Sequence, residues 1–419
     1  MHELNAPVVL DDLAAPRFSP QASELLTMVG SIADFCPLDS ATLHAQATTE
    51  TGLEDFGSRD YMDRLDLLLG CYRDVPGLTP AGRVNLYMQL LQLLKNRLLL
   101  TDLLRREPGI AEIELLPPVV IAGLPRTGTT HLLQLLAATG LFRTLPYWES
   151  SEPFPLGTEL GVVPDPRWAR CEQALAMMHE AMPHFVLMHE LDTPDHVHEE
   201  IGLLANDFSS MHFETLADIP AWRDYYLAHD QAPHYAYLRL QLQALQHLRG
   251  GRRWLLKSPQ HLEQLPALAA VFPGSTVILT HRDPAHVVTS MATMIAYTQR
   301  MFVAHPDPVR TGRVWADRLD AMLTALLRDR SVLGPHQSLD VPFEAFMADQ
   351  RATLEQVLEL AGEKFSVQAR AGADEYLARH QQGHLGRVDY RPEAVGLDPD
   401  ELRSRFAAYS ARFLSQESE

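Results

Sequence analysis

The sequence predicts an α/β protein with a P-loop-type parallel sheet flanked by helices. Four short apolar runs alternate with longer helical stretches, which is typical of a parallel sheet covered on both faces. The first run, at 119–121, leads through a loop with two glycines directly into a helical stretch. That arrangement places free backbone N–H groups and a helix start around an anion. The 419 residues, of which 46% are hydrophobic, can also form an additional element beside the sheet.

The segment that precedes the first apolar run is predicted to be helical. Residues 1–20 look loosely structured, and no strand pattern interrupts 21–115. The stretch 81–105 is rich in leucine at helical spacing and is bounded on both sides by Pro and Gly. We therefore expect a helical N-terminal extension over 1–115 and the α/β domain over 116–419.

The later apolar runs predict the remaining strands of the sheet. These strands are expected at 254–256, 276–280 and 339–343, and helices at 260–271, 285–301, 312–328 and 350–362. Between the first two strands, 145–250 reads as a mostly helical insertion that is rich in His, Met and aromatic residues. Ligands of parallel sheets bind at the carboxyl ends of the strands. We expect this insertion to form a helical cap over a substrate site.

Composition narrows the possible partners and the compartment. The net charge of −19 disfavours nucleic-acid binding. No apolar run approaches the roughly 20 residues of a membrane span, and the N-terminus lacks the pattern of a secretory signal. Three widely spaced cysteines, Cys36, Cys71 and Cys171, suggest a reducing compartment. We expect a cytoplasmic protein without a transmembrane segment, and the oligomeric state stays open.

The loop from Gly123 to Thr130 is the most informative motif of the chain. Its two glycines have the spacing of a phosphate loop, but Thr129 stands where the usual lysine would follow Gly128. Arg126 supplies a planar cation suited to phosphate or sulfate oxygens, and the threonines supply hydroxyl donors. The loop is predicted to bind phosphate in a way that differs from an ATPase. The alternative is an ordinary strand-to-helix turn with a capping threonine.

Two further motifs follow predicted strands. Arg282 comes at the end of the strand at 276–280, and Ser290 lies about two helical turns later, so both could face one anion. Alternatively, Arg282 pairs with a carboxylate and Ser290 lies on a helix surface. Lys257 ends the strand at 254–256, where it is either a solvated charge or a cation aimed at the site.

The motifs GLPRTGTT, LLKSP and HRDP, with a serine eight residues after the last arginine, together resemble the sulfotransferase superfamily. The similarity is to the broad bacterial group and, more distantly, to the tyrosylprotein sulfotransferases, and it spans about 115–415. It implies transfer of a sulfonate group from 3′-phosphoadenosine-5′-phosphosulfate (PAPS) to a hydroxyl, without a metal. It also implies that the 5′-phosphosulfate is cradled by Pro125, Arg126, Thr127, Gly128, Thr129 and Thr130.

The same resemblance implies further roles. Arg282 and Ser290 would bind the 3′-phosphate, and Lys257 would lie near the bridging oxygen as a catalytic cation, together with Arg126. Arg387 lies where many members close a loop over the nucleotide, although the pattern there is weak. Glu149, 23 residues after the loop arginine, matches the glutamate base of the protein-tyrosine enzymes. The other candidates for the base are His189, the main alternative, and Glu152, Glu190, His196, His198, Glu199 and Glu200.

The acceptor is predicted to be a small, apolar hydroxyl compound, lipid-like or aryl. This prediction rests on apolar cap residues that could equally form the core of the cap: Met177, Met178, Met182, Phe185, Met188, Phe208 and Phe213. The main alternative function is a P-loop small-molecule kinase. It would need a loop lysine and a magnesium carboxylate, and neither is evident. A binding-only relative of the enzymes is the other alternative.

Overall fold

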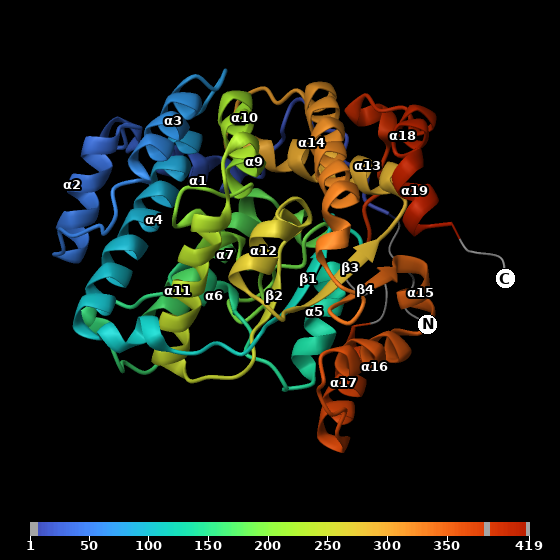
Figure 1. Cartoon of the computed structure of the whole chain (residues 1–419). Coiled ribbons are helices and arrows are strands. Elements are labelled where there is room, and N and C mark those ends of the chain that lie inside the picture. Colours follow the sequence, from blue (N-terminus) through green and yellow to red (C-terminus); the bar gives the residue numbers. More distant parts are fainter. Residues whose placement is uncertain (1–6, 381–385, 416–419) are drawn as a thin grey trace.

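The computed structural model describes residues 7–380 and 386–415, and a parallel sheet forms its centre (Figure 1). Its strands are β1 (Val119–Gly123), β2 (Leu255–Lys257), β3 (Thr276–His281) and β4 (Ser338–Pro342). They lie in the order β2-β1-β3-β4, and each neighbouring pair is parallel. The predicted α/β class is therefore confirmed.

Successive side chains of β1 point to opposite faces of the sheet, as a strand requires. Val120 and Ala122 join the core on one face, and Val119 and Ile121 join the core on the other. The first face is covered by α11 (Ala232–Arg249), α12 (Leu265–Val271), α13 (Pro284–Thr298) and α14 (Pro308–Asp329). The second is covered by α5 (Thr129–Ala138), α16 (Gln350–Leu360) and α17 (Val367–Arg379) (Figure 1).

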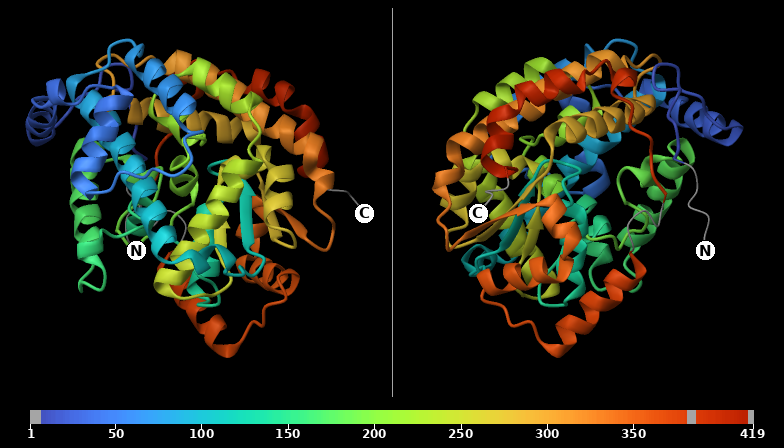
Figure 2. Two further views of the ribbon diagram at one scale, coloured as in Figure 1. Left: turned by 60° about the vertical axis from the view of Figure 1, so that its left-hand side comes forward. Right: turned by 90° about the vertical axis from the view of Figure 1, so that its right-hand side faces the viewer.

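The N-terminal region is helical, as expected. Its helices are α1 (Pro20–Gly30), α2 (Ser40–Thr51), α3 (Met62–Arg73) and α4 (Pro80–Arg106). The Thr79 side chain caps α4 by accepting a hydrogen bond from the Gly82 N–H, and Arg105 and Arg106 complement the dipole at its other end. Both views of Figure 2 show these blue helices at one side of the molecule and the orange α16 and α17 at the bottom.

The insertion between β1 and β2 is mostly helical, as predicted. It comprises α6 (Tyr147–Ser151), α7 (Pro166–Ala181), α8 (Ile201–Ala205), α9 (His212–Leu216), α10 (Pro220–Ala228) and the longer α11. Phe213 and Trp222 from this insertion share a core with Leu90 and Leu94 of α4. The insertion and the N-terminal helices are thus packed together, and the division into 1–115 and 116–419 stays a prediction.

The C-terminal region returns to the sheet. It comprises α15 (Phe343–Ala348), which follows β4 directly, then α16 and α17, and finally α18 (Pro399–Arg405) and α19 (Ala407–Phe413). In the described parts of the chain, no helix is long and apolar enough to cross a membrane.

One predicted helix is divided. The stretch expected at 260–271 forms a 3-10 helix at Pro259–Glu263 and then α12, which begins at Leu265. Pro266 occupies the first turn of α12, where its missing N–H costs nothing, but it could not continue an existing helix. The expected strand at 254–256 is β2, shifted by one residue.

Candidate active site

The predicted site residues gather at one edge of the sheet. Gly123 ends β1, Lys257 ends β2 and His281 ends β3, with Arg282 directly after it. Because the strands are parallel and adjacent, their carboxyl ends meet, and ligands bind at this edge in parallel sheets. The topology therefore brings three motifs that are far apart in sequence to one place.

The loop after β1 depends on its glycines. A Cβ atom on Gly123 would lie 1.9 Å from Thr280 Oγ1, so only glycine lets β1 and β3 approach so closely at their ends. Gly128 has a φ of 86° and directly precedes α5. Arg126 has a φ of 70°, a conformation that is costly for a residue with a side chain. The strained arginine lies at the turn of the loop.

The backbone N–H groups of this loop are available to a ligand. Those of Arg126, Thr127, Gly128, Thr129 and Thr130 donate no hydrogen bond to any residue that the structure describes. Five such donors at the start of a helix can bind an anion, since the helix dipole adds to their attraction. Phosphate binding by this loop stays a prediction from its sequence.

Two arginines add positive charge beside these N–H groups. The Nη1 of Arg282 donates to the Arg126 carbonyl oxygen at 2.8 Å, and the Nε of Arg126 donates to Ser290 Oγ at 3.2 Å. Burial and the charge of Arg126 lower the pKa of Arg282. Neither arginine forms an ion pair with a carboxylate of a described residue, although most arginines of the chain do. Two adjacent cations without a counterion indicate a site for a multiply charged anion.

Lys257 is held at both its backbone and its side chain. The Lys257 N–H donates to Glu200 Oε2 at 2.8 Å, and the Glu200 carboxylate also accepts from His261 Nε2. The Lys257 Nζ lies 3.0 Å from Glu199 Oε1 and 3.4 Å from Thr130 Oγ1. Its ammonium group is therefore aimed at the phosphate loop and is not a solvated charge at a strand end.

His189 lies beside the same cations. Burial, together with the smaller effects of the charges of Lys257, His196 and Arg126, lowers the pKa of this histidine to about 3. The Met188 carbonyl, next to it in the chain, accepts a hydrogen bond from the Arg126 guanidinium. His189 is partly exposed and is neutral above about pH 4. A neutral imidazole in this position can accept a proton.

Glu149 is not brought into this group. Its fully buried carboxylate accepts from Arg143 at 2.7 Å and from Arg249 at 3.2 Å. Arg143 forms an isolated parallel β-bridge with Trp254, directly before the start of β2. Lys257 lies at the opposite end of that strand. With both oxygens bound by arginines, this carboxylate has the environment of a structural ion pair.

The structure also refines the loop threonines. The hydroxyl of Thr127 is buried and bonds to the Leu124 carbonyl and to Thr280 Oγ1 at 2.7 Å each. It therefore stabilises the loop, and Thr127 can offer a ligand its backbone N–H. Thr129 is also buried, whereas Pro125 and Thr130 are partly exposed.

The C-terminal segment reaches the site through a residue that was not predicted. Tyr390 OH lies 3.3 Å from Arg126 Nη2, whereas the Arg387 side chain is exposed. The backbone of Arg387 instead accepts a hydrogen bond from the Val8 N–H. A charge pattern selects Arg387, but no sequence pattern marks the neutral Tyr390.

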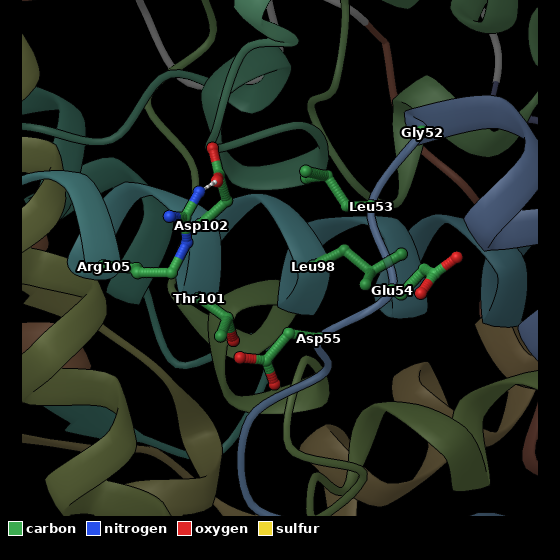
Figure 3. Close-up of a pocket in the computed structure, with 8 residues that line it drawn as sticks. All are labelled: Gly52, Leu53, Glu54, Asp55, Leu98, Thr101, Asp102 and Arg105. Atoms are coloured by element: carbon green, nitrogen blue, oxygen red, sulfur yellow. Dashed lines mark hydrogen bonds and ion pairs between the residues drawn. The ribbon is translucent and has the colours of Figure 1, made fainter.

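A depression of about 320 Å³ lies elsewhere, against the N-terminal helices (Figure 3). It is lined by the loop at 52–55 and by one side of α4, where Arg105 and Asp102 form an ion pair at 2.8 Å. It contains none of the predicted site residues, and three of its four charged side chains, Glu54, Asp55 and Asp102, are acidic, so it does not suit the same anion.

Comparisons with known proteins agree with the geometry at the sheet edge. The chain is similar in structure to the sulfotransferase STF1 of Mycobacterium tuberculosis H37Rv, with 26% identity and a TM-score of 0.77 over 89% of this chain and 100% of that chain. The sulfotransferase STF9 of Mycobacterium avium is 24% identical, with a TM-score of 0.79 over 89% of this chain and 96% of that one, which shows the shared fold.

No curated protein matches the chain significantly. The model of the sulfotransferase family matches residues 117–366, which include β1, the phosphate loop, Lys257, Arg282 and Ser290. This match covers more than half of the chain and every motif that the structure places at the sheet edge. The chain therefore belongs to the sulfotransferase family.

Proposed function

We propose that this protein transfers a sulfonate group from PAPS to the hydroxyl of a small, apolar acceptor by in-line attack. The observation that supports this proposal most strongly is the pair Arg126 and Arg282. These adjacent cations form no ion pair with any described carboxylate, and they lie beside five N–H groups that donate to no described residue. A nucleotide with phosphates at both its 3′ and 5′ positions supplies negative charge to both parts of such a site.

The residues present suit each part of this donor. The N–H groups of the loop and Arg126 would hold the 5′-phosphosulfate, and Arg282 with Ser290 would hold the 3′-phosphate. PAPS supplies an activated sulfonate whose leaving group is the 5′-phosphate. Lys257 stabilises negative charge at the loop, because its ammonium group points to Thr130. Each charge-assisted hydrogen bond of this kind contributes roughly 1.5–3 kcal/mol.

We propose His189 as the base that accepts the acceptor's proton. It is neutral, partly exposed and close to Lys257 and Arg126. Glu199 is the alternative: its Oε2 has no hydrogen-bond partner among the described residues, but this oxygen is buried, and its Oε1 binds Lys257. Glu149 stays an untested prediction from the resemblance, and its two arginine partners argue against it.

The remaining parts of the proposal concern the metal and the compartment. Among residues 7–380 and 386–415, no group of three or more His, Cys, Asp or Glu side chains is arranged to hold a metal ion. Independence from metals stays a prediction, to be checked by transfer in the presence of a chelator. The free thiols of Cys36, Cys71 and Cys171 suit a reducing compartment, and we propose the cytoplasm.

Transfer of labelled sulfonate from PAPS to a panel of phenols and alcohols tests the function and the base together. We expect His189→Asn to lower kcat by about 10²–10⁴-fold, the usual effect of losing a general base. Glu149→Gln should leave kcat within a few-fold, provided that the variant folds. Full activity of His189→Asn together with an inactive Glu199→Gln would transfer the role to Glu199. Absence of transfer to every acceptor would contradict the proposed function.

A further inference from the structure

Four rings stand in a series beside the proposed base. We call Phe185, His189, His198 and Tyr147 the ring wall. Their consecutive centroids are 5.6, 5.9 and 4.9 Å apart, and the ring planes are inclined by 60°, 75° and 72°. These are the separations and edge-to-face angles that aromatic rings prefer. The ring wall is therefore a packed surface of π systems, although its rings come from two segments of the cap.

Backbone hydrogen bonds fix the ring wall in place. The His189 N–H donates to the Phe185 carbonyl at 2.8 Å in a tight turn, which holds these two rings together. The His198 N–H donates to the Leu145 carbonyl at 2.7 Å, next to an antiparallel bridge between Pro146 and Val197. That bridge brings Tyr147 to His198.

The ring wall adjoins the cations of the site. Met188, between Phe185 and His189 in that turn, accepts a hydrogen bond from the Arg126 guanidinium through its carbonyl. The charges of Lys257 and Arg126 act on His189, and the charge of Lys257 acts on His198 as well. The phosphate loop and the ring wall therefore belong to one site.

The imidazoles of the ring wall are unlike histidines of a core. Within the described part of the chain, neither the His189 nor the His198 side chain has a hydrogen-bond partner, and both are partly exposed. Buried polar groups in native proteins are nearly always hydrogen-bonded. Side chains that keep unpaired nitrogens and some exposure are available to a ligand.

We propose that the acceptor is an uncharged phenol, whose aromatic ring lies against the ring wall with its hydroxyl at His189. This inference rests on the proposed function and specifies its acceptor. A flat aromatic ring gains stacking and edge contacts with the four rings that a saturated ring of equal size cannot make.

The electrostatics of the site agree with this class of acceptor. Burial lowers the pKa of both His189 and His198, and neighbouring cations add to the effect. The burial and the neighbouring cations that keep these imidazoles neutral also disfavour binding of an ammonium group. Amine acceptors are therefore disfavoured. A base with a pKa of about 3 is weak, and proton transfer to it is far easier from a phenol, with a pKa near 10, than from an alkyl hydroxyl, which is close to water at about 15.7.

The step balances without another reactant. The phenol oxygen forms a bond to sulfur, and the bond between sulfur and the bridging oxygen of the 5′-phosphate breaks. The electron pair of that bond leaves with the bridging oxygen, and the phenol proton passes to a ring nitrogen of His189. The products are an aryl sulfate and 3′-phosphoadenosine 5′-phosphate.

Matched acceptors test the proposal in the full chain with PAPS. We compare 2-naphthol with decahydro-2-naphthol, the same skeleton without aromatic rings, and 4-ethylphenol with tyramine, which adds an ammonium group. We expect kcat/KM to be at least 100-fold higher for 2-naphthol than for decahydro-2-naphthol. For 4-ethylphenol it should be at least tenfold higher than for tyramine. Tyr147→Leu and Phe185→Leu should each lower kcat/KM for 2-naphthol by about 2- to 12-fold, the value of one ring contact, and lower kcat/KM for decahydro-2-naphthol by a smaller factor.

The controls separate this inference from the proposed function. Tyr225→Leu removes a ring that stacks on His229, outside the ring wall. It should change kcat/KM for neither 2-naphthol nor decahydro-2-naphthol. Binding of 3′-phosphoadenosine 5′-phosphate reports whether each variant is folded. Transfer that favours decahydro-2-naphthol or tyramine, or ring-wall variants that affect both naphthol skeletons equally, would overturn the inference while sulfonate transfer stands. If no acceptor reacts, failure of 2-naphthol to bind the nucleotide-loaded protein would also overturn it.

Discussion

Asp207 connects the N-terminal helices to the cap, and Asp207→Asn tests how much this junction stabilises the protein. Its buried carboxylate lies 2.6 Å from Arg97 Nη1 and 3.2 Å from Arg64 Nη2, both on the N-terminal helices. It also accepts from His234 Nδ1 of α11 at 2.5 Å. Asparagine would remove the carboxylate that pairs with the buried Arg97 and would leave Arg64 only its longer pair with Asp60. Breaking a buried ion pair in this way costs about 3–5 kcal/mol.

For a chain of this length, an unfolding entropy of roughly 2.1 cal/mol/K per residue converts that loss into a melting temperature about 3–6 °C lower. Differential scanning calorimetry measures this shift. Asp60→Asn is the matched control, because Asp60 pairs with the same Arg64 at 3.5 Å but its side chain is 54% exposed. We expect it to cost less than about 1 kcal/mol. Equal shifts for the two variants, or none for Asp207→Asn, would refute the reasoning.

Two further predictions concern the loop and the sheet edge. Gly123→Ala should weaken binding of 3′-phosphoadenosine 5′-phosphate, measured by calorimetry, at least tenfold, because the added Cβ would lie 1.9 Å from Thr280 Oγ1. Gly109→Ala, whose Cβ would meet no atom within 4 Å, is the control. Equal affinities of the two variants for the nucleotide would contradict the prediction. For Asp340, burial raises the pKa, but hydrogen bonds from His281 and Arg330 outweigh it and hold the pKa at about 2, below its ordinary value of 3.8. This carboxylate therefore stabilises the fold above about pH 4 and loses that effect as the pH falls towards 2. The melting temperature of Asp340→Asn should consequently fall less steeply between pH 4 and pH 2 than that of the wild-type protein. An equal fall in melting temperature for the two proteins would contradict the prediction.

The sheet and the phosphate loop were predictable because their signals are local. The β-branched run at 119–121 and the glycines at 123 and 128 encode strand and turn directly, and the structure confirms the parallel sheet. The placement of Lys257 and Arg282 at one edge of the sheet was also predictable, because the carboxyl ends of parallel strands meet there. The shifted strand at β2 and the divided helix at Pro266 show that element ends depend on single residues.

The surroundings of the base could not be predicted, because they depend on contacts between distant segments. No local sequence pattern shows that Arg143 and Arg249 bind the Glu149 carboxylate. Arg249 lies 100 residues after Glu149 in the chain. Nor does the sequence show that Glu199 faces the Lys257 side chain while Glu200 faces its backbone. These placements follow from how the cap folds back over the ends of the strands.

Calorimetric binding of 3′-phosphoadenosine 5′-phosphate and of AMP tests the central claim most directly, because the two differ only in the 3′-phosphate. Arg282 and Ser290, at roughly 1.5–3 kcal/mol for each charge-assisted contact, predict that the bisphosphate binds about 10²- to 10⁴-fold more tightly. Arg282→Ala should reduce this difference to about 10- to 10²-fold, the contribution left to Ser290, and leave AMP binding nearly unchanged. Equal affinity of the wild-type protein for the two nucleotides, or tighter binding of ATP with magnesium, would contradict the account.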